Sequence, residues 1–188
     1  MVQDPALSAH EHREHAEHAA HANDPFISQV SITVAALAVL AAAAGSLESV
    51  EGGAAITASS QSVLEQDKAT DSWNEYQADS LKRHLYTIAA QEGGPHESEF
   101  RRTAQEQNTK QASVRAHAAA HEAQRDRLAA ESAEHERRHH WLTGAATLLE
   151  IGIAMSTVTI ITKRRPLWIG ALALGVAGSA LLVAAYVL

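Results

Sequence analysis

Three long apolar runs divide this chain, and we predict transmembrane helices over them, at residues 25–47, 141–162 and 167–188. Each run is long enough to cross the hydrocarbon core of a bilayer as a helix. Asp24 and Pro25 form a good helix start, because Asp caps free backbone N–H groups and Pro suits the first helical position. The pattern therefore predicts an all-α protein with three transmembrane helices.

The polar stretch between the first two runs, residues 48–140, has a turn signal at its middle. Gly93, Gly94 and Pro95 interrupt a sequence of good helix formers. We predict that the first and second helices extend out of the membrane as a long antiparallel coiled-coil hairpin with its turn at 92–95. This register sets several opposite charges near one another: Lys82 near Glu106, Asp79 near Lys110, and Glu48 and Glu51 near His140 and Arg137.

Thin apolar stripes follow both arms of this hairpin. The first arm carries Ile56, Val63, Leu81, Leu85 and Ile88, and the return arm carries Phe100, Ala104, Val114, Ala118 and Ala129. Only 4% of the residues are aromatic, so the polar part cannot bury a large core. We interpret the stripes as pairing faces of the hairpin and expect a homo-oligomer. Trp73 and Tyr76 lie off the hairpin stripe, which suggests an inter-subunit contact.

The link between the last two spans, residues 163–166, carries Lys163, Arg164 and Arg165. The positive-inside rule places this link in the cytoplasm. The N-terminus is then cytoplasmic, and the hairpin and the C-terminus are extracytoplasmic. Arg137 and Arg138, at the other end of the second span, are a counter-signal.

Residues 1–24 are rich in histidine and glutamate and show no apolar periodicity. A flexible tail is the preferred interpretation, and weak binding of a divalent metal or a response to pH is the alternative. The acidic start and the overlong apolar run that follows favour an uncleaved signal anchor over a cleaved signal peptide.

A polar line crosses the second span on one helix face, formed by Thr143, Thr147, Glu150 and Thr157. An ionisable residue near the centre of a bilayer is costly unless it is paired, neutral or facing water. The line could therefore face a water-filled path between identical subunits. The preferred alternative is that Glu150 is protonated and bonds a neighbouring helix, with the threonines bonding their own backbone.

Small residues form one face of the third span, at Ala171, Gly175 and Gly178. Such a face lets another helix approach closely. We expect it to be a packing face.

Two pairs of histidines have the i, i+4 spacing that lets two imidazoles meet one metal ion. In the predicted register His117 and His121 come opposite Asp71 and Asp67, which would complete a shell of two histidines and two aspartates. The second pair is His135 and His139. Solvated histidines on an exposed helix are the preferred interpretation.

Composition excludes several classes of function. The chain has no cysteine, so thiol chemistry and disulfides are excluded. A net charge of -7 with interleaved basic residues argues against nucleic-acid binding. No nucleophile elbow or phosphate-binding glycine loop is present, so we expect no enzyme and no required cofactor.

The chain resembles domain-of-unknown-function family 4337, uncharacterised bacterial membrane proteins with one early span and two late ones. The resemblance rests on three segments, which are Asp24-Pro25-Phe26, Asp71 to Ala78 with Lys82 following, and Thr147-Leu148-Leu149-Glu150 leading to Thr162-Lys163-Arg164-Arg165. It implies a multi-pass protein of the bacterial inner membrane and no established activity. The family pattern has Gln where this chain has Glu150, which argues against an obligatory proton carrier.

The leading prediction is thus a non-enzymatic homo-oligomeric scaffold of the lipid bilayer, built by the hairpin and the spans. The alternatives are an ion or proton channel lined by the second span, and metal or pH sensing by the histidines.

Overall fold

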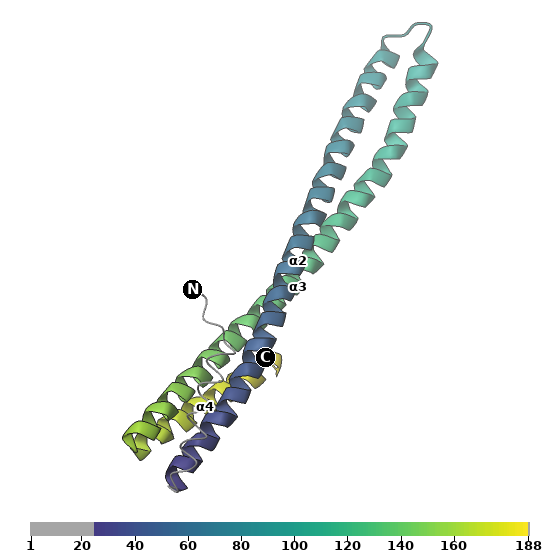
Figure 1. Cartoon of the computed structure of the whole chain (residues 1–188). Coiled ribbons are helices and arrows are strands. Elements are labelled where there is room, and N and C mark those ends of the chain that lie inside the picture. Colours follow the sequence, from purple (N-terminus) through teal and green to yellow (C-terminus); the bar gives the residue numbers. More distant parts are fainter. Residues whose placement is uncertain (1–24, 188) are drawn as a thin grey trace. The chain divides into compact units, whose positions relative to one another are not determined.

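The computed structural model describes residues 25–187 and contains three long helices (Figure 1). Helix α2 is Pro25–Gln91, α3 is Glu97–Thr162 and α4 is Arg165–Val187. The predicted all-α class is confirmed. All three helices are long and apolar enough over part of their length to cross a membrane. The predicted tail at 1–24 lies outside the described residues.

Both connections between helices are short and use left-handed backbone. Gly93 and Gly94, with φ of 77° and 115°, end α2, a conformation that costs glycine little. Glu97 N–H donates to the Gly94 carbonyl at 3.3 Å as α3 begins. Lys163, with φ of 53°, ends α3, and its N–H donates to the Thr159 carbonyl at 2.8 Å. Residues 92–96 thus separate α2 from α3, and residues 163–164 separate α3 from α4.

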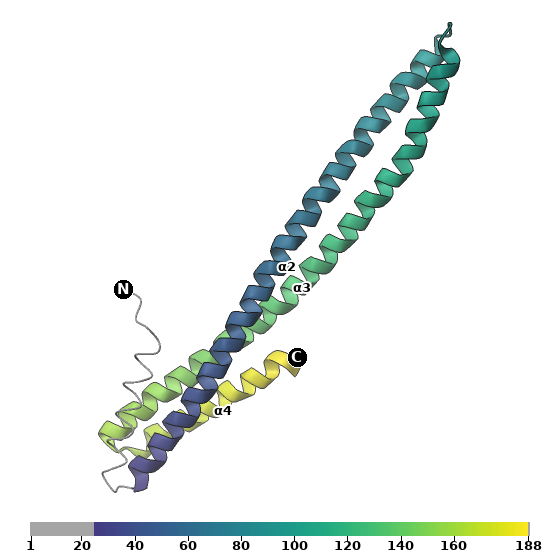
Figure 2. The ribbon, with the colours of Figure 1, turned by 45° about the vertical axis from the view of Figure 1, so that its right-hand side comes forward.

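The chain divides into two compact units, which we describe separately. Unit 1 holds the described residues up to Gly52 and from His135, and unit 2 is Gly53–Glu134. Within unit 2, rising residue numbers on α2 meet falling numbers on α3 (Figure 2). Three hydrogen bonds mark this order: Ser132 to the Ala55 carbonyl at 2.9 Å, Ser62 to the Arg125 carbonyl at 3.2 Å, and Arg83 to Asn108 at 2.9 Å.

Alanine provides half of the buried residues where the two arms of unit 2 meet. The buried residues are Ala58, Ala69, Asp79 and Ala90 on α2, with Gln111, Val114, Ala118 and Leu128 on α3. Alanine lets two helix backbones approach closely and costs little side-chain entropy. The α2 side of the contact is therefore mainly alanine, and α3 contributes the larger Val114 and Leu128.

The apolar stripe of the first arm does not take part in this contact. Its members are Ile56, Val63, Leu81, Leu85 and Ile88, which we call the α2 stripe, and they are 55% to 71% exposed. The buried residues of the same helix lie on its other side, as helical spacing from Ala58 and Ala69 shows. The interpretation of this stripe as the pairing face of the hairpin is therefore wrong.

Unit 1 packs segments of all three helices around a small apolar core. Leu37 and Ala44 of α2 meet Ala146 and Leu149 of α3, and Leu182 of α4 packs against them. Ala171, Gly175 and Gly178 are buried, as expected of a close-packing face. A Cβ added at Gly175 would lie 2.5 Å from Leu37 Cδ2, and one at Gly178 would lie 2.9 Å from Leu149 Cγ.

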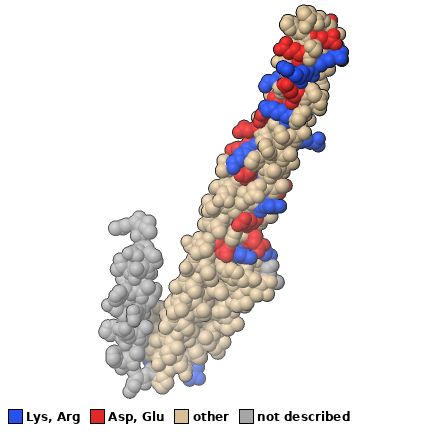
Figure 3. Space-filling model, turned by 90° about the vertical axis from the view of Figure 1, so that its right-hand side faces the viewer, with Lys and Arg blue, Asp and Glu red and all other residues tan. Residues whose placement is uncertain are grey.

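The two units differ in surface charge. On the face shown in Figure 3, Lys, Arg, Asp and Glu side chains gather over unit 2, while much of the surface of unit 1 carries none. This fits a unit 1 made of apolar helices and a unit 2 exposed to water.

Candidate functional site

The polar line predicted on the second span is exposed in unit 1. Thr143, Thr147 and Glu150 are exposed on α3, and Thr157 is half-buried. The buried Leu142 and Leu149 lie about a quarter turn around the same helix from Glu150. Thr147 and Glu150 are therefore outside the core that α3 shares with α2 and α4.

The threonines on this line bond locally. Thr147 Oγ1 donates to the Thr143 carbonyl at 2.8 Å, and Thr157 Oγ1 donates to the Ile153 carbonyl at 3.0 Å. Thr143 Oγ1 also reaches Glu48 Oε1, at 2.6 Å. These bonds satisfy hydroxyl donors that would otherwise be costly in an apolar environment.

Glu150 differs from the threonines. Over residues 25–187, no hydrogen bond or ion pair holds its carboxyl group, and the residue is exposed. Within residues 25–187, the interpretation in which Glu150 bonds a neighbouring helix thus finds no partner on α2 or α4, and that interpretation stays a prediction.

A second cluster surrounds Glu51, which is 7% exposed and lies in unit 1. His135 Nδ1 lies 2.5 Å from Glu51 Oε2, and Tyr186 Oη donates to Glu51 Oε1 at 3.2 Å. Arg138 Nη1 lies 4.0 Å from Glu51 Oε1, and its guanidinium stands 5.6 Å from the Tyr186 ring centroid. One carboxylate therefore joins α2, α3 and α4.

Burial acts to raise the pKa of Glu51, but the other contacts outweigh it. Hydrogen bonds from His135 and Tyr186, together with the charges of His135 and Arg138, hold this pKa below its ordinary value. The carboxylate therefore stays ionised at neutral pH. The predicted register placed Glu51 near Arg137, and the structure places His135 and Arg138 of the same helix beside it.

The two histidine pairs separate onto different partners. His135 contacts Glu51, while His139 Nδ1 lies 3.1 Å from the Glu48 carbonyl. In unit 2, His121 Nδ1 lies 2.6 Å from Glu65 Oε2, and His117 is exposed. Asp67 and Asp71, the proposed acidic ligands, are also exposed. Among residues 25–187 no three His, Asp or Glu side chains are grouped to hold a metal ion, and the metal hypothesis stays a prediction.

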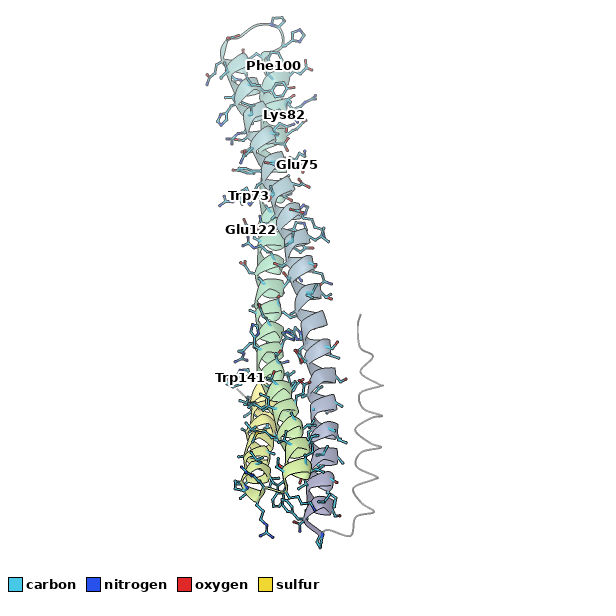
Figure 4. The ribbon with its side chains drawn as sticks, turned by 60° about the vertical axis from the view of Figure 1, so that its left-hand side comes forward. Trp73, Glu75, Lys82, Phe100, Glu122 and Trp141 are labelled. Atoms are coloured by element: carbon cyan, nitrogen blue, oxygen red, sulfur yellow. The ribbon has the colours of Figure 1, made fainter. Side chains whose placement is uncertain are left out.

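Trp73 and Tyr76 are half-buried and take part in the hairpin itself. Trp73 Nε1 donates to Glu122 Oε1 at 2.9 Å, so the pair labelled in Figure 4 joins α2 to α3. The Trp73 and Tyr76 rings stand edge to face, with centroids 5.6 Å apart. Their predicted role in an inter-subunit contact stays a prediction.

Buried charge also joins the arms of unit 2. Asp79 is 1% exposed, and its Oδ2 lies 3.0 Å from Lys110 Nζ, so the predicted neighbours are confirmed. Lys110 also pairs with Glu75 at 2.7 Å, and Lys82 pairs with Asp79 at 3.5 Å rather than with the expected Glu106. The hydrogen bond from Lys110 is the main cause that lowers the pKa of Asp79.

The basic link is exposed at Lys163, Arg164 and Arg165. The Arg165 guanidinium stands 5.8 Å from the Phe26 ring centroid, and Trp168 packs edge to face on Phe26 at 5.8 Å. Basic and aromatic side chains thus gather at this end of unit 1, the composition typical of a membrane interface.

These features define a class of protein, an all-α protein whose three helices each contain a membrane-length apolar segment. The chain belongs to the family described as Domain of unknown function (DUF4337), whose model matches residues 26–188. Neither the curated proteins nor the solved structures include a match to this chain.

Proposed function

We propose that this protein is a homo-oligomeric scaffold of the bacterial inner membrane, with no enzymatic activity. The apolar segments of α2, α3 and α4 cross the bilayer. The arms of unit 2 form an antiparallel coiled-coil hairpin in the extracytoplasmic space, where it contacts further copies. The basic link at 163–165 favours a cytoplasmic position for that end of the spans.

The exposed carboxyl group of Glu150 supports this proposal most directly. It lies on an apolar segment of α3, on the side that neither α2 nor α4 covers. A carboxylate at the centre of a lone span costs about 3 kcal/mol on insertion scales. A second copy that supplies a hydrogen-bond partner, or a shared hydrated space, removes most of that cost.

Substitution of Glu150 tests this role. In Glu150→Leu we expect fewer copies per particle in native mass spectra from mild detergent, because the polar contact between copies is lost. Glu150→Gln keeps a hydrogen-bonding group of the same shape and should retain the wild-type mass. Val158→Leu, at another exposed position of α3, is the matched control. An unchanged mass in Glu150→Leu would remove Glu150 from the subunit contact.

An ion or proton channel is the second candidate function. It is favoured by the exposed line of Thr143, Thr147 and Glu150, since a polar line of this kind can face water between subunits. The candidate predicts cation flux into liposomes that carry the purified protein. Glu150→Ala should lower this flux, and Val158→Ala should not. Equal flux in Glu150→Ala and wild type would show that Glu150 plays no part in conduction.

A further inference from the structure

We propose that the α2 stripe is a contact between two copies of this chain, in which the two α2 helices run parallel and in register. This inference deepens the scaffold function proposed above and rests on it. It assigns the contact outside the membrane to Ile56, Val63, Leu81, Leu85 and Ile88.

Exposure of the stripe is the first observation. Its five large apolar side chains are 55% to 71% exposed, and the neighbouring Leu64 is 53% exposed. A single exposed apolar side chain is ordinary on a protein surface, but several grouped on one helix face mark a contact site. The stripe forms two such groups, Ile56 with Val63 and Leu81 with Leu85 and Ile88, with polar residues between them. The alanine contact with α3 occupies the other side of the helix and leaves the α2 stripe free.

The composition of α3 indicates which surface of a second copy contacts the α2 stripe. The large apolar side chains of α3 in unit 2 are Phe100, Val114 and Leu128, and each is buried or half-buried. The exposed large apolar side chains that a second copy presents in this unit are therefore those of the α2 stripe and Leu64. Contact of a surface with its own copy is the isologous arrangement of a two-fold dimer.

Spacing along the stripe fits a coiled-coil seam. Ile56 and Val63 are one heptad apart, and so are Leu81 and Ile88. Asn74 and Asp67 lie seven and fourteen residues before Leu81, so they occupy the same heptad position as Leu81 and Ile88. Heptad repeats keep one face toward a partner helix, and a central Asn is a known device for fixing register.

Membrane insertion determines the relative direction of the two α2 helices. Copies inserted in one bilayer share one orientation, so their α2 helices run the same way. In register, the patch at Ile56 and Val63 meets itself, and so does the patch at Leu81, Leu85 and Ile88. If one α2 helix were shifted by one heptad along the other, polar residues of one copy would lie against the edge of an apolar patch on the other. The buried apolar area between the two copies would then be smaller.

Charge around the stripe is compatible with this pairing. The acidic residues Glu65 and Asp79 serve contacts with α3, to His121 and Lys110, and lie away from the stripe. Asp67 is the exception, because in the proposed dimer its two copies meet on the axis and repel. This repulsion weakens the contact in a way that a substitution can remove.

Cysteine cross-linking tests the proposal directly, because the chain has no cysteine of its own. We would place Val63→Cys or Leu81→Cys in the full chain, reconstitute it in lipid and oxidise it. Each variant should form a disulfide-linked dimer. Ala119→Cys, at an exposed position of α3, is the matched control and should form few. If neither variant links to itself but a mixture of Val63→Cys and Leu81→Cys does link, the two helices are antiparallel. That result would overturn the proposal.

A second variant keeps the test independent of disulfide formation. Asp67→Leu should tighten association about tenfold, the effect of removing about 1.4 kcal/mol of repulsion. Leu81→Lys should weaken it, and Gln105→Lys, exposed on α3, should leave it unchanged. If the protein is oligomeric but neither cysteine links and Asp67→Leu has no effect, the α2 stripe is not the contact and the scaffold function stands. A monomeric wild type would overturn both.

Discussion

Lys110 Nζ lies 3.0 Å from Asp79 Oδ2, and the aspartate is 1% exposed although its helix is largely solvated. Glu75 holds the same ammonium group from one turn away, at 2.7 Å. The pair joins α2 to α3 through charge, close to the buried Gln111 and Val114 of α3. The stability of the hairpin should therefore depend on this pair more than on its many surface ion pairs.

Lys110→Met should destabilise the protein by about 1 to 3 kcal/mol, because it leaves a buried carboxylate with fewer donors. The matched control is Arg102→Met, which breaks the solvent-exposed pair with Glu106 at 3.5 Å and should cost less than about 1 kcal/mol. Thermal unfolding followed by circular dichroism measures both. Equal effects of the two substitutions would contradict a special role for Asp79 and Lys110.

Acid should weaken the hairpin through the same carboxylate. The pKa of Asp79 is lower in the folded protein than its ordinary value of 3.8, so the unfolded state binds protons more readily. Its contribution to stability is full above that ordinary value and is lost as the pH falls through the lowered pKa. Melting temperatures of wild type and Asp79→Asn should therefore converge as the pH is lowered below about 4. A difference that stays constant down to the lowest pH would contradict this linkage.

Close approach of α2 and α4 should make Gly175 intolerant of a side chain. Gly175→Ala places a Cβ 2.5 Å from Leu37 Cδ2, and overpacking of this kind costs about 1 to 3 kcal/mol. Gly45 has nothing within 4 Å of the same added atom, so Gly45→Ala should be neutral or mildly stabilising. Thermal unfolding in detergent compares the two variants. Rescue of Gly175→Ala by Leu37→Ala would identify the clash as the cause.

The Glu51 cluster should stabilise unit 1. Glu51→Ala removes the carboxylate that His135, Arg138 and Tyr186 share, and we expect a loss of about 1 to 3 kcal/mol. Glu136→Ala is the control, because Glu136 is exposed and pairs loosely with His140 at 3.9 Å. The readout is again the unfolding midpoint. If the two variants unfold alike, the buried carboxylate does not hold the three helices together.

The all-α class and the three long helices could be predicted from the sequence, because apolar length is a local property. It also placed Asp79 by Lys110, since a short turn fixes which residues of two arms face each other. It failed on which face of α2 meets α3. Large apolar residues were expected at the contact, whereas alanines such as Ala58 and Ala69 occupy it. Alanine carries little periodic signal in a sequence so rich in alanine, so the true contact face could not be recognised.

The Glu51 cluster was also missed in detail. Its members come from three helices, and the position of Tyr186 on α4 relative to α2 is set by packing of Gly175 and Gly178 rather than by any local pattern. The exposed position of Glu150 likewise depends on which side of α3 packs against α2 and α4. The sequence shows that the polar line exists, but not whether another helix covers it.

The proposed scaffold requires that identical copies of this chain associate. The mass of the wild-type protein in lipid nanodiscs or mild detergent, measured by native mass spectrometry, reports this association. We expect a single dominant species that contains two or more copies and persists on dilution. A particle that holds one copy at every concentration would rule the scaffold out.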